Sequence, residues 1–123
     1  MSEHNTQSAF IQWCRWNEAK YPELEEAYSI PNGAYLAGDK VQRAIQMNRL
    51  KAEGFKTGVP DWCLPVPLGG YASLYIEFKH GKNKLSDAQK QFIRRLEKRG
   101  HCVAVCYSVD EAINVTKEYL DGK

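Results

Sequence analysis

The sequence lacks the features that mark membrane-spanning and exported proteins. No stretch of about 18 apolar residues, the length that a membrane helix needs, occurs anywhere in the chain. The first residues show no signal-peptide pattern of a basic region followed by an apolar one. We therefore expect a cytoplasmic protein.

Metal-binding and disulfide patterns are also missing. The four cysteines, Cys14, Cys63, Cys102 and Cys106, have no C-x-x-C spacing, and the three histidines have no H-E-x-x-H spacing. Cys102 and Cys106 fall on the same side of one apolar segment, as is typical of core packing. A zinc site and a disulfide framework are therefore not expected, and a reduced compartment fits the thiols.

The net charge of the chain is small, and its charged residues are unevenly distributed along the sequence. A length of 123 residues is enough for one core, so we expect a single domain over residues 1–123. The net charge of +2 alone does not indicate a nucleic-acid partner. The segment from residue 79 to 101, however, contains eight basic residues and only two acidic ones. The basic residues are Lys79, Lys82, Lys84, Lys90, Arg94, Arg95, Lys98 and Arg99, and the acidic ones are Asp87 and Glu97. This segment could hold phosphates, although a solvated helix face gives the same pattern.

Hydrophobic periodicity and capping residues predict an α/β protein. We expect helices near residues 2–20, 39–54, 86–100 and 108–120, and strands near 60–66, 73–79 and 102–107, with a short element near 24–30 that becomes a strand. Ser86 and Gln89 form one capping-box pattern. The apolar residues 102–107 predict a strand covered on both faces. Trp13 and Trp16 are predicted in the core, with a subunit interface as the alternative.

The polar residues of two neighbouring segments indicate a catalytic site. In the strand pattern Leu74–Lys79, Glu77 and Lys79 share one face and lie about 7 Å apart. Asp61 precedes the previous strand, and the turn at Gly69-Gly70 brings that strand back towards Glu77. Because Mg²⁺ is usually held by one or two carboxylates, Asp61 and Glu77 are candidate metal ligands, with the backbone carbonyl of Phe78 as a third. Taken alone, this triplet also fits an ordinary turn and a solvated strand face.

Several separated motifs in a fixed order resemble the VRR-NUC (virus-type replication-repair nuclease) branch of the PD-(D/E)XK superfamily. These motifs are Glu3 followed by Gln7, Ile30-Pro31-Asn32-Gly33, Gly54 to Asp61, Leu74 to Lys79, Leu85 to Gln89, then Leu96, Gly100 and Val103 to Tyr107, and finally Ser108, Asp110, Glu111 and Ala112. The resemblance covers nearly the whole chain. It implies the PD-(D/E)XK fold, a central mixed β-sheet flanked by helices with an αβββαβ core.

The resemblance also implies an activity and assigns roles to residues. It implies a Mg²⁺- or Mn²⁺-dependent DNA endonuclease of a phage or bacterium that acts as a homodimer on branched, Holliday-junction-like DNA in replication and repair. Lys79 would act at the transition state, Glu3 would complete the metal shell, and Gln89 would point into the site instead of only capping its helix. Asn32 and Gly33 would touch the nucleic-acid backbone or form a plain turn, and Lys82, Lys84 and Lys90 would bind phosphates. The alternatives are a non-catalytic nucleic-acid-binding or assembly subunit and an RNA-directed nuclease on the same fold.

Overall fold

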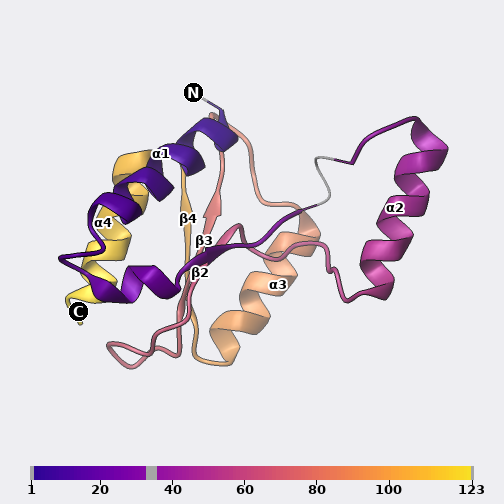
Figure 1. Cartoon of the computed structure of the whole chain (residues 1–123). Helices are drawn as coiled ribbons and strands as arrows, with labels where there is room; N and C mark the ends of the chain where they lie inside the picture. The colour runs from indigo at the N-terminus through magenta and orange to yellow at the C-terminus, as the bar shows by residue number, and fades with distance from the viewer. Residues whose placement is uncertain (1, 33–35, 123) are drawn as a thin grey trace.

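The computed structural model describes residues 2–32 and 36–122 and shows a sheet with helices on both sides (Figure 1). The elements are α1 (Glu3–Trp16), a 3-10 helix η1 (Pro22–Glu26), β1 (Tyr28–Ser29), α2 (Lys40–Ala52), β2 (Trp62–Leu64), β3 (Leu74–Phe78), α3 (Asp87–Lys98), β4 (Cys102–Cys106) and α4 (Val109–Leu120). This order confirms the predicted succession of helices and strands.

The four strands form one mixed sheet in the order β1-β2-β3-β4. The first two pairings are antiparallel and the pairing of β3 with β4 is parallel. In the register of β2 and β3, Trp62 lies opposite Ile76 and Leu64 lies opposite Leu74. Gly69 and Gly70, both with positive φ, make the turn between these two strands. The register therefore sets Asp61, one residue before β2, beside the end of β3.

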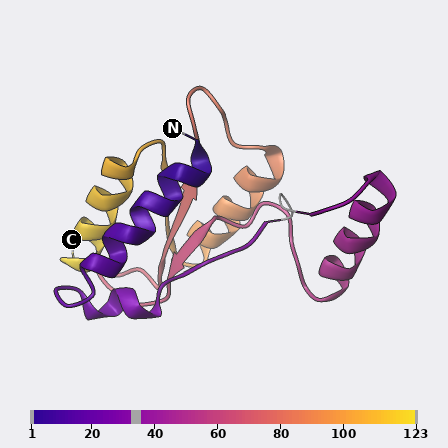
Figure 2. The same ribbon diagram turned by 45° about the horizontal axis from the view of Figure 1, so that its top comes forward.

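The apolar core lies between the sheet and the pair α1 and α4. Both views show these two helices together on one side of the sheet and α3 on the other (Figures 1 and 2). Phe10 of α1 is fully buried, and its ring contacts Trp62 edge-on at 4.9 Å and Phe78 at 5.7 Å between centroids. The face of β3 that carries Phe78 is thus fixed in the core, which directs the alternate side chains to the opposite face.

Two details differ from the sequence-based expectation. Helix α1 ends at Trp16, and Asn17 is its C-cap residue, with its backbone N–H and its side-chain amide both donating to the carbonyl of Trp13. Trp16 is 74% exposed, so its predicted place in the core is wrong, whereas Trp13 packs against the core. Strand β4 lies at an edge of the sheet and is only half-buried along most of its length, although α3 and α4 both contact it.

Helix α2 stands apart from the sheet in both views (Figures 1 and 2). Asp39 and Gln42 form a capping box at its start, as the sequence predicts for Asp39, and Gly54 follows its end with positive φ. None of its residues is buried. Within residues 2–32 and 36–122, no helix is long and apolar enough to cross a membrane.

Candidate active site

Asp61 and Glu77 meet where the start of β2 pairs with the end of β3. The backbone N–H of Asp61 donates to the carbonyl of Ile76 at 3.0 Å. Its carboxylate oxygen Oδ2 accepts a hydrogen bond of 2.8 Å from the backbone N–H of Phe78. Asp61 is therefore tied to β3 on both sides of Glu77, and this backbone geometry holds the two carboxylates together.

The Glu77 carboxylate is buried, and one of its two oxygens lacks a hydrogen-bond donor. Only 3% of the residue is exposed, and none of the residues that the structure describes donates a hydrogen bond to its oxygen Oε1. Burial, followed by the negative charge of Asp61, raises the pKa of Glu77 from 4.5 to about 8. Burial also raises the pKa of Asp61, against the opposing effects of the Phe78 hydrogen bond and of Lys79. Two ionised carboxylates can only accept hydrogen bonds, so neither can donate to the other. A proton or a cation between them is therefore needed to hold the pair together.

Lys79 is the positive group next to this acid pair. It follows β3 directly, and its backbone N–H donates to the carbonyl of Cys106 at 2.9 Å, which extends the pairing with β4 by one residue. Its Nζ lies 3.9 Å from Oε2 of Glu77, and only 9% of the residue is exposed. Its charge lowers the pKa of Glu77, but this effect is smaller than that of burial. The lysine is thus held at the site and compensates the two acids only in part.

Gln89 caps α3 and also reaches the acid pair, whereas its predicted role towards a metal-bound water or a phosphate stays a prediction. Its Oε1 accepts from the backbone N–H of Ser86 at 2.9 Å, and its own backbone N–H donates to Ser86 Oγ at 3.2 Å, which makes the predicted capping box. Its Nε2 donates to Oε2 of Glu77 at 3.3 Å. One side chain therefore caps α3 and fixes the rotamer of Glu77, with the amino end of α3 directed towards the site.

Gly58 sets the distance between α3 and the segment that leads to Asp61. Its φ is +89°, and a Cβ added there would lie 2.5 Å from the backbone carbonyl oxygen of Ala88. Only glycine allows this close approach without moving the first turn of α3. Gly58 lies in one of the sequence motifs, but its contact with α3 depends on the tertiary structure and has no local sequence signal.

Glu3 lies near the acid pair but bonds elsewhere. Its Oε2 accepts a hydrogen bond of 3.1 Å from Nδ2 of Asn83, which lies in the loop after β3, and Tyr107 Oη donates to the carbonyl of Asn83 at 3.0 Å. The charge of Glu3 raises the pKa of both Asp61 and Glu77. No local sequence pattern indicates a role for Asn83, since its partner Glu3 lies 80 positions earlier in the chain.

The predicted nucleic-acid contacts lie around the site at the surface. Lys82 and Lys84 are exposed in the loop after β3, and Lys90 is exposed on α3. Asn32 lines two surface cavities, one against α1 and one against the first turn of α3. Gly33, the other residue of the predicted turn, lies outside the described residues.

The donor set fits a hard divalent cation. Asp61 and Glu77 offer carboxylate oxygens, and the unpaired Oε1 of Glu77 is the kind of buried oxygen that a cation would satisfy. In the part of the chain that the structure describes, no three or more His, Cys, Asp and Glu side chains are grouped so as to hold a metal. A shell for this ion would therefore need backbone oxygen, water or substrate phosphate besides the two carboxylates, and the role of Glu3 stays a prediction.

The chain folds as an α/β domain with a four-stranded mixed sheet flanked by helices. The chain belongs to the VRR-NUC family, since its residues 1–110 match the VRR-NUC domain. A solved structure described as a VRR_NUC domain protein aligns with a TM-score of 0.80 and 25% identity, over 99% of this chain and 90% of that chain. No curated protein matches the chain. The family and the fold inferred from the sequence motifs are thus confirmed, and membership implies a nuclease that binds DNA.

The buried acid pair predicts how the stability of the metal-free protein depends on pH. In EDTA, the free energy of unfolding should fall as pH rises from 4.5 towards 8. The folded protein keeps a proton on Glu77 in this window, whereas the unfolded chain releases it, so the folded state binds more protons. The groups that face Glu77 are Asp61, Lys79, Gln89 and Glu3, and the pKa of Asp61 is shifted in the same direction.

Urea denaturation at a series of pH values measures this slope. Glu77→Gln should flatten it and raise the stability at the alkaline end by roughly 1–3 kcal/mol, the usual cost of an unsatisfied buried group. Glu118→Gln, which changes an exposed acid on α4, is the matched control and should leave the slope unchanged. Equal slopes in the wild type and Glu77→Gln would contradict the assignment.

Proposed function

We propose that the protein is a Mg²⁺- or Mn²⁺-dependent endonuclease that hydrolyses DNA phosphodiester bonds at Asp61, Glu77 and Lys79. The observation that carries this proposal is the buried Oε1 of Glu77, which has no donor among the described residues and lies in an acid pair beside a lysine. A purely structural site would be expected to satisfy that oxygen. An unsatisfied acid pair in a fold of this class fits a site that is completed by a cation.

In the proposed reaction each side chain has one task. Asp61, Glu77 and the backbone carbonyl of Phe78 would hold the cation, and Glu3 would join them directly or through water. The cation, when bound, supplies a Lewis acid for the scissile phosphate and lowers the pKa of the attacking water. Lys79 places its ammonium group where negative charge develops on the phosphate. Gln89 keeps the Glu77 carboxylate in its rotamer through the hydrogen bond to Oε2.

The basic residues beside the site would hold the substrate backbone. Lys82 and Lys84 lie in the loop between β3 and α3, and Lys90 follows Gln89 on α3. All three are exposed, so their charges are available to phosphates. Asn32, at the edge of the cavity that contains Asp61, would contact the backbone on the opposite side.

The proposal extends to a homodimer that prefers branched over linear duplex DNA. A monomer of 123 residues offers a small footprint, and a twofold dimer would present two sites to two strands. The exposed Trp16 supports an interface between copies, since a large aromatic side chain that is 74% exposed is typical of contact surfaces.

Removing either carboxylate tests the cation site. Asp61→Asn and Glu77→Gln should each lower cleavage of plasmid and branched DNA by roughly 10²-fold or more, because an amide cannot compensate the charge of a divalent ion. Glu118→Gln should cleave like the wild type. Gel assays with Mg²⁺, Mn²⁺ and excess EDTA measure the effect. Full activity in either variant, or in EDTA, would refute the metal site.

Lys79→Ala should lower kcat by roughly 10²–10³-fold with little change in DNA binding, because charge at the transition state lowers the barrier directly. Lys82→Ala is the contrasting variant and should weaken binding modestly and leave kcat unchanged. Single-turnover cleavage and fluorescence anisotropy in Ca²⁺ separate the two effects. If Lys79→Ala lost binding and turnover in equal proportion, the lysine would be a docking residue.

Two assays test the predicted oligomeric state and the predicted substrate preference. Light scattering at micromolar concentration should report a dimer, and Trp16→Ser should weaken it, whereas Ile45→Ser on the separate helix α2 should not. Competition between a four-way junction and the same sequences as linear duplex should favour the junction. Because contacts would be to the backbone, affinity should fall steeply with salt. A monomer that cuts both substrates equally well would contradict this part of the proposal.

A further inference from the structure

The loop between β3 and α3 is joined to the start of α1 through Asn83. The side-chain Nδ2 of Asn83 donates a hydrogen bond of 3.1 Å to Oε2 of Glu3, the first residue of α1. Among residues 2–32 and 36–122, no other group donates to the Glu3 carboxylate. The orientation of this acid therefore depends on one amide from a distant part of the chain.

Both backbone polar groups of Asn83 are bound as well. Its N–H donates to the carbonyl of His80 at 3.0 Å, which closes a tight turn in which Gly81 has a φ of +59°. Its carbonyl accepts a hydrogen bond of 3.0 Å from Tyr107 Oη. Because the backbone of Asn83 is fixed on both sides, its side chain loses little further conformational entropy when it donates to Glu3.

Tyr107 connects this loop to another part of the fold. It follows β4 directly, and its backbone N–H donates to Oε2 of Glu111 at 3.1 Å, in the first turn of α4. Its hydroxyl thus joins the end of β4 and the start of α4 to the loop, and Asn83 joins the loop to α1. Contacts from three separate elements together set the place of the Glu3 carboxylate.

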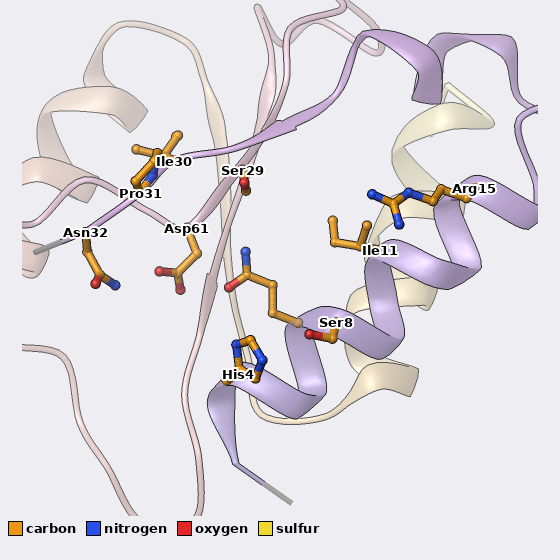
Figure 3. Close-up of a pocket in the computed structure, with 10 residues that line it drawn as sticks. His4, Ser8, Ile11, Arg15, Ser29, Ile30, Pro31, Asn32 and Asp61 are labelled. Atoms are coloured by element: carbon orange, nitrogen blue, oxygen red, sulfur yellow. The ribbon is translucent and has the colours of Figure 1, made fainter. Parts of the chain in front are cut away.

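The start of α1 lies beside the acid pair. His4, the residue after Glu3, lines a cavity of about 430 Å³ together with Asp61, and Figure 3 shows both residues at this cavity. The charge of Glu3 raises the pKa of both Asp61 and Glu77. Glu3 is therefore close enough to the two acids to be repelled by them.

An unrestrained glutamate at this position would favour solvent. A Glu side chain has several rotatable bonds, and like charges repel one another at short range, so both entropy and electrostatics oppose its placement beside two acids. The amide of Asn83 counteracts these effects, because a hydrogen bond to an ionised acceptor is stronger than one between neutral groups. Glu3 is thus held in place before any cation binds.

We propose that Asn83 is a positioning residue: held by Tyr107, it keeps the carboxylate of Glu3 beside the acid pair, where this third acid supports the binding of a divalent cation. The inference rests on the proposed nuclease function and deepens it, since it names the residues that hold the third acid. Asn83 acts through Glu3 and is not itself a ligand.

Binding of Mn²⁺ in the absence of DNA tests this role. Asn83→Ala should raise the Kd for Mn²⁺ roughly tenfold, because losing a group that orients an acid at a metal site usually costs roughly 10–100-fold in affinity. Tyr107→Phe removes only the hydroxyl and should raise the Kd by a smaller factor. Asn114→Ala changes an exposed asparagine on α4 and should bind Mn²⁺ like the wild type. Electron paramagnetic resonance of free Mn²⁺ measures the Kd, and Asp61→Asn gives the background from sites elsewhere on the chain.

A double-mutant cycle separates positioning from a general effect on the fold. Glu3→Ala should also weaken Mn²⁺ binding, and Asn83→Ala should add little in that background, because the group that it positions is gone. In EDTA, urea should unfold Asn83→Ala and Asn114→Ala at nearly the same concentration, since both replace exposed side chains. An asparagine with only a structural role would instead lower the stability, and its effect on Mn²⁺ binding would add to that of Glu3→Ala.

The results that would overturn this inference differ from those that would overturn the nuclease. If Asp61→Asn lost Mn²⁺ while Asn83→Ala bound it like Asn114→Ala, Asn83 would have no positioning role and the cation site would stand. If Asn83→Ala weakened binding equally with and without Glu3, it would not act through that acid. If Asp61→Asn bound Mn²⁺ as the wild type does, the cation site would be refuted, and the role of Asn83 with it.

Discussion

The structure depends on one constraint: the buried carboxylate of Glu77 and the half-buried carboxylate of Asp61 are held together at the pairing of β2 with β3. The register that opposes Trp62 and Ile76 places Asp61 beside Glu77, and the N–H of Phe78 locks Asp61 there. Burial raises the pKa of both acids, and one oxygen of Glu77 is left without a donor among the described residues. A protein keeps such an arrangement at a cost to stability, which is typical of a functional site.

The surrounding elements hold this pair in place. Phe10 and its aromatic neighbours fix one face of β3 in the core, so the other face must carry Glu77 towards α3. The glycine at position 58 lets α3 approach closely enough for Gln89 to reach Glu77 while it caps its own helix. Lys79 continues the strand beyond the acid and partly balances its charge. Core packing, helix capping and site geometry are therefore parts of one arrangement.

The sequence predicted what depends on local pattern and missed what depends on long-range contact. Strand alternation put Glu77 and Lys79 on one face, and the structure agrees. The bond between Glu3 and Asn83 joins residues 80 positions apart, and no local pattern indicates it. The apolar pattern of the helix placed Trp16 in the core, whereas in the structure Trp16 is the last residue of α1 and is 74% exposed. Capping residues predicted helix α2 well, but not that it would stand apart from the sheet.

The central claim is that the acid pair is the binding site of a divalent cation. Crystals grown with Mn²⁺ and measured near the manganese absorption edge test it directly. We expect a peak in the anomalous difference map within coordination distance of a carboxylate oxygen of Asp61 and of Oε1 of Glu77. Crystals of Asp61→Asn should show no such peak. A protein that crystallises at saturating Mn²⁺ with no peak between these two residues would contradict it.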